Sequence, residues 1–394
     1  MYWRASIIDE QGDVIGQVRE LDRLVRAFPA SSFAADARLS AAVETGRAGR
    51  TAEALTRLEA ITRAGTADQA SEAARWHAVF RAGTGTAAAP AIAAAAYDPT
   101  SLGAILDRSA TDVQQPLPPI AFAETGASNV DTSMVAEWMT STFGAPGPAL
   151  TADAERTLAL GFELVAAGED TVGRRILSIA IAQRGERPHD LLEVARAAGT
   201  AGLPDIQAQA AVTLLNQLTP QHKLEAPKAV LRLAYPLAYA PETIDASQRA
   251  GVPALLLLAL VRQESMFYPR AGSSAGAFGL AQLMPGTADD TAKSLGLPLP
   301  TPAQLADPAT SLRLGAHYLG VQLRAFDGNV PAALSAYNGG PGNASRWQRD
   351  HSPRSFDGLL WSTDFSETRS YLEHVLENYA WYRYIYVGSP LSIR

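Results

Sequence analysis

Two stretches near the start of this 394-residue chain repeat one helical pattern at an offset of 37 residues. The apolar residues of the first stretch are Val18, Leu21 and Leu24, and their counterparts stand 37 positions later. A spacing of three places such side chains on one helical face, and a glycine precedes each stretch. Paired helices of this length are typical of tetratricopeptide-like repeats, so the pattern predicts an α-solenoid. An irregular all-helical domain is the alternative.

The remaining sequence also predicts helices separated by Gly- and Pro-rich breaks, and therefore an all-α fold. We predict a helical repeat segment over residues 1–150, a further helical segment over 151–238 and a compact helical domain over 239–394. The repeat pattern begins without a cap at Tyr2. We therefore expect residues upstream of Met1, including any signal peptide, to be missing from this sequence.

Composition excludes several classes of function. The net charge is −7, and from Gly251 to Arg394 there are 11 basic and 11 acidic residues, so no basic domain is present to hold nucleic acid. The absence of cysteine excludes thiolate nucleophiles, disulfides and cysteine-bound zinc. The six histidines have no metal-ligand spacing, so we expect neither a metal nor a cofactor. The longest strongly apolar run, 252–261, is too short to cross a bilayer.

Glu264 is the first candidate for chemistry. It lies near the end of a predicted helix, 254–265, and follows Leu257, Leu260 and Val261 at helical spacing. A carboxyl group on an apolar face is costly to ionise, which raises its pKa. A Glu that keeps its proton near neutral pH suits general-acid cleavage of a glycosidic bond. The alternative is a helix-end Glu turned towards water.

Four ordered motifs follow one another in the last third of the chain. They are E-S-M-F-Y-P at 264–269, S-S-A-G-A-F-G-L-A-Q-L-M-P at 273–285, A-Y-N-G-G-P-G at 336–342 and E-T-R-S-Y-L-E-H-V-L at 367–376. In this order and spacing they resemble the soluble lytic transglycosylases. The resemblance is strong over about 240–386 and implies a goose-lysozyme-like catalytic domain that follows a ring-like helical superhelix.

The resemblance implies cleavage of the β-1,4 bond between N-acetylmuramic acid and N-acetylglucosamine in peptidoglycan, without water and with formation of a 1,6-anhydro sugar. It makes Glu264 the sole acid/base, and it places the hydroxyl group of Tyr337 near the reaction centre. Ordinary glycosidases use two carboxylates, whereas substrate-assisted enzymes are exceptions. The acetamido group of the substrate would supply the missing nucleophile.

The resemblance also implies a set of substrate-binding residues: Ser273, Gln282, Met284, Asn338 and Glu367. Two of them have a structural alternative, because Asn338 suits a left-handed turn and Glu367 suits the first turn of a helix. We expect the aromatic residues that crowd the terminal helix, Tyr379 to Tyr386, to be core rather than a sugar platform.

The chain departs from the family pattern at two positions. Ala281 stands where the family commonly has Met, which would widen a sugar subsite or alter the packing beneath it. Gly339 stands where the family commonly has Ala, which would loosen the turn that carries Tyr337. Neither change removes a polar reacting group.

Two other functions compete with the transglycosylase. A muramidase on the same fold would use water instead of the C6 hydroxyl group, and Asp289 or Asp290 would be its second carboxylate, although that pair is typical of a polar helix face. A non-catalytic helical scaffold would only bind glycan. We expect a periplasmic monomer that acts on peptidoglycan glycan strands, with cell-wall synthesis or lysis proteins as partners.

Overall fold

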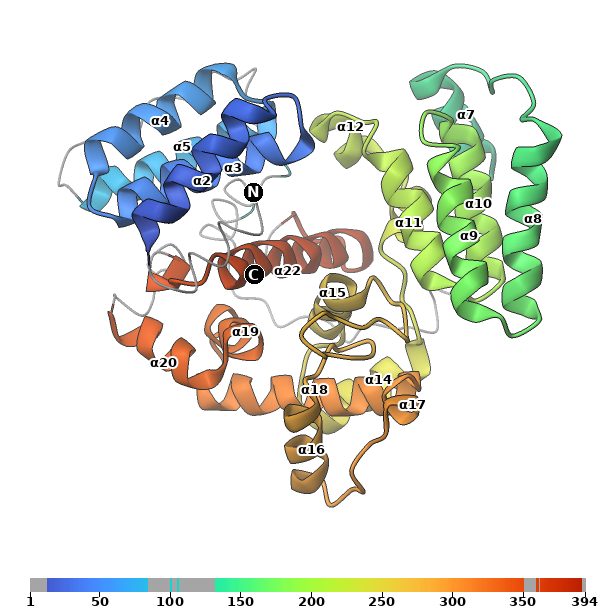
Figure 1. The fold of residues 1–394 in the computed structure, drawn as a ribbon. Coiled ribbons are helices and arrows are strands. Elements are labelled where there is room, and N and C mark those ends of the chain that lie inside the picture. The colour runs from blue at the N-terminus through green and yellow to red at the C-terminus, as the bar shows by residue number, and fades with distance from the viewer. Residues whose placement is uncertain are drawn as a thin grey trace. The chain divides into compact units, whose positions relative to one another are not determined.

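The computed structural model describes residues 13–83, 100, 105, 132–350, 359–360 and 362–391. Every regular element in these residues is an α-helix (Figure 1). Two isolated β-bridges link Gly272, Phe278 and Leu283. The all-α prediction is therefore confirmed. Among the described residues no single helix is long and apolar enough to span a membrane. Helices α14 and α15 together have that length and apolarity, but the chain bends by 116° between them.

The chain divides into two compact units, and each is described by itself. The first unit comprises 1–114, 319–380 and 391–394, and the second comprises 115–318 and 381–390. Two of the four divisions fall within helices, α18 (Pro308–Ala325) and α22 (Ser366–Tyr386). The predicted boundaries at 150 and 238 stay a prediction.

The first unit begins with two helical hairpins. Its helices are α2 (Val14–Ala27), α3 (Ser32–Arg47), α4 (Thr51–Ala64), α5 (Ala67–Gly83), α19 (Val330–Gly339), α20 (Pro341–Asp350) and most of α22. Helix α2 packs on α3, and α4 packs on α5 (Figure 1). Val18, Leu21 and Leu24 are buried against Ala37 and Ala41, so the predicted apolar face of α2 is confirmed.

The second unit holds a second helical array and the segment around Glu264. Its helices are α7 (Thr132–Phe143), α8 (Ala152–Ala166), α9 (Asp170–Ala182), α10 (Pro188–Thr200), α11 (Pro204–Leu215), α12 (Pro220–Glu225), α13 (Lys228–Ala234), α14 (Ala240–Ala250), α15 (Ala254–Ser265), α16 (Pro285–Ser294), α17 (Pro302–Leu305) and the start of α18. Gly168 and Gly202 lie between helices, as expected of Gly-rich breaks, whereas Gly199 lies in the last turn of α10.

The C-terminal helix α22 is a core element of both units. Leu372, Val375 and Leu376 are buried in its first part, and Tyr382 is fully buried in its last. The hydroxyl group of Tyr382 donates to the carbonyl group of Pro236 at 3.0 Å. Tyr379, Trp381 and Tyr382 are therefore core residues, as predicted, whereas Tyr384 and Tyr386 are half-buried.

Buried charges join the first helical hairpin to the start of α22. The Arg369 guanidinium pairs with the Glu44 carboxylate of α3, and both side chains are buried. Arg47 also bonds Glu44, at 3.0 Å, and a second N–H group of Arg369 donates to the carbonyl group of Thr363. Since burial removes water from all these groups, each needs its partner.

Removing one partner of this buried pair should be costly. We expect Glu44→Ala to lower the free energy of unfolding by about 3–5 kcal/mol, because Arg369 stays buried without its carboxylate. Asp153→Ala removes an exposed pair with Arg156 and should cost less than about 1 kcal/mol. Urea titration of the three proteins measures both values, and equal losses would contradict the assignment.

A second ion pair in the first unit predicts a pH effect. Burial raises the pKa of Glu373 to about 7, although Arg75 donates to it at 2.7 Å. The folded protein then holds a proton on Glu373 that the unfolded chain releases above its ordinary value of 4.5. Stability should therefore fall as the pH rises from about 4.5 to 7. Glu373→Gln should flatten this slope in thermal melts, and an unchanged slope would refute the prediction.

Candidate active site

Glu264 lies in the last turn of α15. The preceding run from Leu255 to Val261 is fully buried, whereas Glu264 is half-buried. Helix α15 has the predicted bounds, and Pro253 is its N-cap residue. The helix therefore runs through an apolar core and ends with the Glu264 carboxyl group near the solvent.

The end of α15 is fastened to the glycine-rich loop that follows it. The hydroxyl group of Ser265 donates to the carbonyl group of Leu280 at 2.9 Å and to that of Val261 at 3.1 Å. The bond to Leu280 joins the residue next to Glu264 to the second sequence motif. Residues 265 and 280 are therefore held together within one unit.

The loop after α15 is an ordered turn. The Ser273 hydroxyl accepts from the backbone N–H of Ala277 at 2.9 Å, and Ser273 is exposed. The Gln282 amide donates to the carbonyl groups of Ala271, at 2.9 Å, and Gly279, at 2.8 Å. Gln282 is half-buried and Met284 is exposed. Gln282 thus holds the loop closed, and its sugar contact stays a prediction.

Gly279 lets this loop approach α17 and α18 closely. Its φ is +86°, and a Cβ there would lie 2.5 Å from the carbonyl oxygen of Leu305 and 2.8 Å from Ser311 Oγ. The adjacent Ala281 is fully buried, and its N–H donates to Ser311 Oγ at 3.3 Å. Because its side chain is enclosed, the Ala281 substitution concerns packing beneath the loop rather than an open subsite.

The Tyr-Asn-Gly-Gly motif ends α19 in the first unit. Tyr337 is buried, and Asn338 is helical and half-buried. The alternative that Asn338 forms a left-handed turn is wrong, because Gly340 takes the positive φ, at +87°. Thr368 Oγ1 instead donates to Asn338 Oδ1 at 2.6 Å. The third and fourth motifs therefore meet through this bond.

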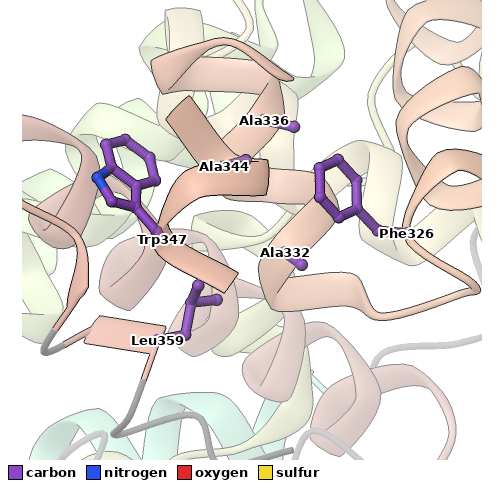
Figure 2. Packing of buried hydrophobic residues seen from close by; sticks show 6 residues of the cluster. All are labelled: Phe326, Ala332, Ala336, Ala344, Trp347 and Leu359. Atoms are coloured by element: carbon purple, nitrogen blue, oxygen red, sulfur yellow. The ribbon is translucent and has the colours of Figure 1, made fainter. Parts of the chain in front are cut away.

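The space beside Gly339 is filled by an indole ring. A Cβ on Gly339 would lie 2.6 Å from the nearest ring atom of Trp347 and 3.1 Å from Thr368 Oγ1. Trp347 is fully buried, and Figure 2 shows it in one cluster with Phe326 and Leu359 around the small alanines of α19 and α20. Glycine at 339 therefore permits close packing rather than loosening the turn.

The indole ring of Trp347 has a fixed polar partner as well. Its Nε1–H donates to the Asp364 carboxylate at 2.6 Å, and Arg346 donates two bonds to the same group. These bonds, chiefly the two from Arg346, lower the pKa of Asp364 against the opposing effect of burial. Trp347 is thus held on both its apolar and its polar side.

The predicted site residues fall into two groups. Glu264, Ser273, Gln282 and Met284 belong to the second unit, whereas Tyr337, Asn338 and Glu367 belong to the first. The pairing of Glu264 with Tyr337 therefore stays a prediction. Glu367 is exposed in the first turn of α22, where a carboxylate also favours the helix N-terminus.

The sequence did not predict two residues that form hydrogen bonds to these parts of the candidate site. Thr368, which bonds Asn338, follows Glu367 directly, so its place in the fourth motif was a usable signal. Tyr239, which bonds the carbonyl group of Phe267, lies outside all four motifs, and no sequence signal marked it. Among the described residues no group of three His, Asp or Glu side chains could hold a metal ion.

The chain is similar to known proteins over a stretch that contains the first three motifs. The family model for the transglycosylase SLT domain matches residues 242–358. The chain is 37% identical over 159 residues to the soluble lytic murein transglycosylase of Escherichia coli K12, a match that covers 40% of this chain and 24% of that protein. Residues 242–358 therefore resemble a transglycosylase SLT domain, and the chain is similar in part to soluble lytic transglycosylases. It is also 32% identical over 117 residues to the membrane-bound lytic murein transglycosylase C of Yersinia enterocolitica, covering 27% of this chain and 33% of that one.

Solved structures show the same fold. An inactive mutant of the lytic transglycosylase Slt from Pseudomonas aeruginosa, in which a glutamate is changed to glutamine, matches with a TM-score of 0.62 and 22% identity over 98% of this chain and 58% of that one. The 70-kDa soluble lytic transglycosylase of Escherichia coli matches with a TM-score of 0.57 and 22% identity over 99% and 63%. The predicted fold class is therefore confirmed. The chain spans about a quarter of the length of its curated relatives.

The packing around Gly339 gives a stability prediction. We expect Gly339→Ala to lower the free energy of unfolding by about 1–3 kcal/mol, because the buried Trp347 ring cannot move aside. Gly342→Ala is the matched control, since a Cβ there meets nothing within 4 Å and alanine favours the helix. Denaturant unfolding of both variants checks this, and a stabilised Gly339→Ala would contradict it.

Proposed function

We propose that this chain is a peptidoglycan lytic transglycosylase with Glu264 as its single acid/base. The observation that carries the proposal is the place of Glu264 at the open end of the buried helix α15, inside the matched domain. Between Asp245 and Asp289 it is the one carboxylate in the sequence. A relative in this family is inactive as a Glu-to-Gln mutant, which supports a catalytic glutamate.

The proposed reaction needs one proton carrier and no water. Protonated Glu264 gives its proton to the glycosidic oxygen as the bond to the muramoyl C1 breaks, with help from the acetamido group of the substrate. The Glu264 carboxylate then takes the proton of the C6 hydroxyl group, whose oxygen bonds to C1. The product is a 1,6-anhydromuramoyl end, and Glu264 is protonated again.

The surrounding residues have proposed supporting roles. Ser273 and Met284 are exposed next to the Glu264 segment and are available to touch the glycan, and Gln282 shapes their loop. Tyr337 would aid Glu264 at the reaction centre, and Asn338 and Glu367 would bind the sugar chain. The substrate would be peptidoglycan, as the names of the relatives indicate.

The substrate also determines the proposed compartment. Peptidoglycan lies outside the inner membrane, so we place the working protein in the periplasm, as a monomer and near cell-wall synthesis or lysis proteins. Fractionation of cells that express the complete gene product checks this. Protein found in the cytoplasm alone would contradict it.

The reaction is tested by mass spectrometry of digested sacculi. The wild-type protein should release fragments lighter by one water than the hydrolysed fragments. Glu264→Gln should lower the rate by about 10²–10⁴-fold, because it removes the proton donor. Reducing ends as the sole product would show a hydrolase, and no product would show a non-catalytic scaffold.

Two controls sharpen this test. Asp289→Asn and Asp290→Asn lie on α16 and should keep the wild-type rate, since the second carboxylate of a hydrolase is not required. Circular dichroism of each variant confirms that it folds. A folded Glu264→Gln protein with the wild-type rate would refute the acid/base assignment.

A further inference from the structure

The backbone is strained immediately after Glu264. Met266 and Phe267 follow α15 directly and both have left-handed backbones, with φ of 47° and 66°. Of the five non-glycine residues with positive φ in the described part of the chain, two others also belong to this region, Tyr239 and Gln282. Such strain persists where surrounding contacts over-determine the backbone, and it gathers at functional positions.

Tyr239 is the contact that holds the strained turn from outside it. Its hydroxyl group donates to the carbonyl group of Phe267 at 3.1 Å. Burial and the nearby Asp205 carboxylate raise the pKa of Tyr239, so this donor keeps its proton at any pH at which the protein is assayed. The ring of Phe267 is fully buried and anchors the same residue from the other side.

The next residue is anchored by the helical array. The Arg174 guanidinium of α9 lies over the Tyr268 ring, 5.3 Å from its centre, and Thr171 Oγ1 lies 3.4 Å from the Tyr268 hydroxyl. Arg174 is itself held by the carboxylates of Asp170 and Asp205. The turn from 266 to 268 is thus fixed at two successive residues.

These contacts bear on the position of the Glu264 carboxyl group. Glu264 is two residues from Met266, so rotation in the turn would move the last turn of α15 and the acid with it. Proton transfer needs its donor held to within a fraction of an ångström, and such placement depends on residues that touch no substrate. Glycine at 266 would relieve the strain, yet the chain has methionine there.

We propose that Tyr239 is a positioning residue for Glu264, acting through the strained turn at Met266 and Phe267. The inference rests on the proposed function, because its readout is the rate of the transglycosylase reaction. It extends the machinery to a residue outside the matched family domain, which begins at 242.

The test compares two chemically matched tyrosines. Tyr239→Phe removes one hydroxyl-to-carbonyl bond, and Tyr384→Phe removes another, from Tyr384 to the carbonyl group of Leu224 at 2.8 Å. With a soluble peptidoglycan fragment as substrate, we expect Tyr239→Phe to lower kcat about 5–10-fold and to leave KM within twofold, as for an effect realised in the transition state. Tyr384→Phe should keep both constants while its melting temperature falls as much as that of Tyr239→Phe.

A second pair of variants tests the strain itself. Met266→Gly frees the backbone and Met266→Ala keeps the Cβ constraint, while both remove the thioether side chain. We expect kcat of Met266→Gly to be at least threefold below that of Met266→Ala, although glycine fits the left-handed backbone better. This pair decides the matter if Tyr239→Phe does not fold.

The outcomes separate this inference from the function beneath it. Wild-type kinetics in Tyr239→Phe, or equal kcat in the two Met266 variants, would overturn the positioning role while the transglycosylase assignment stands. A parallel loss in Tyr384→Phe would also overturn it, because the effect would then be general destabilisation. A wild-type protein that releases no anhydro product would overturn the proposed function and this inference with it.

Discussion

Helix α15 must bury an unbroken apolar run and still end in a carboxylate that reaches solvent, and the rest of the candidate site depends on this constraint. Burial of each leucine in the run stabilises the fold by about 1.5–3 kcal/mol, so the helix is held firmly in the core. A rigid helix fixes the position of Glu264 only if the chain that follows the helix also has one defined direction. The left-handed turn at Met266 and Phe267 and the Ser265 bond to Leu280 supply that direction.

The helical arrays contribute to the candidate site as well as preceding it. In the second unit, Arg174 of α9 lies over Tyr268, four residues after Glu264. In the first unit, Glu44 of α3 pairs with Arg369, the neighbour of the threonine that bonds Asn338. Each array therefore contacts a residue of a motif through a charged side chain, Tyr268 of the first motif and Arg369 of the fourth. Buried pairs of this kind add little net stability, but they favour one arrangement over others.

Sequence periodicity predicted the features that depend on residues close together in the sequence. The bounds of α15 and the buried face of α22 follow from side-chain spacing, and the structure has them. The same reasoning missed Tyr239 and the indole ring at Gly339, because both contacts depend on the tertiary fold. Asn338 was open to a left-handed reading for a related reason, since two glycines follow it and only the fold determines which residue turns the chain.

The space around the backbone explains where the candidate site has glycine and where it has a larger residue. Gly279 and Gly339 stand where a neighbouring carbonyl or indole leaves no room for a Cβ. Met266 and Phe267 also have positive φ but are not glycine, and there the side chain is retained at the cost of strain. Because the ring of Phe267 is completely enclosed, its removal would release the turn that the strain defines. The backbone beside Glu264 is therefore held by the packing of a side chain. At Gly279 and Gly339, by contrast, neighbouring atoms leave no room for any side chain.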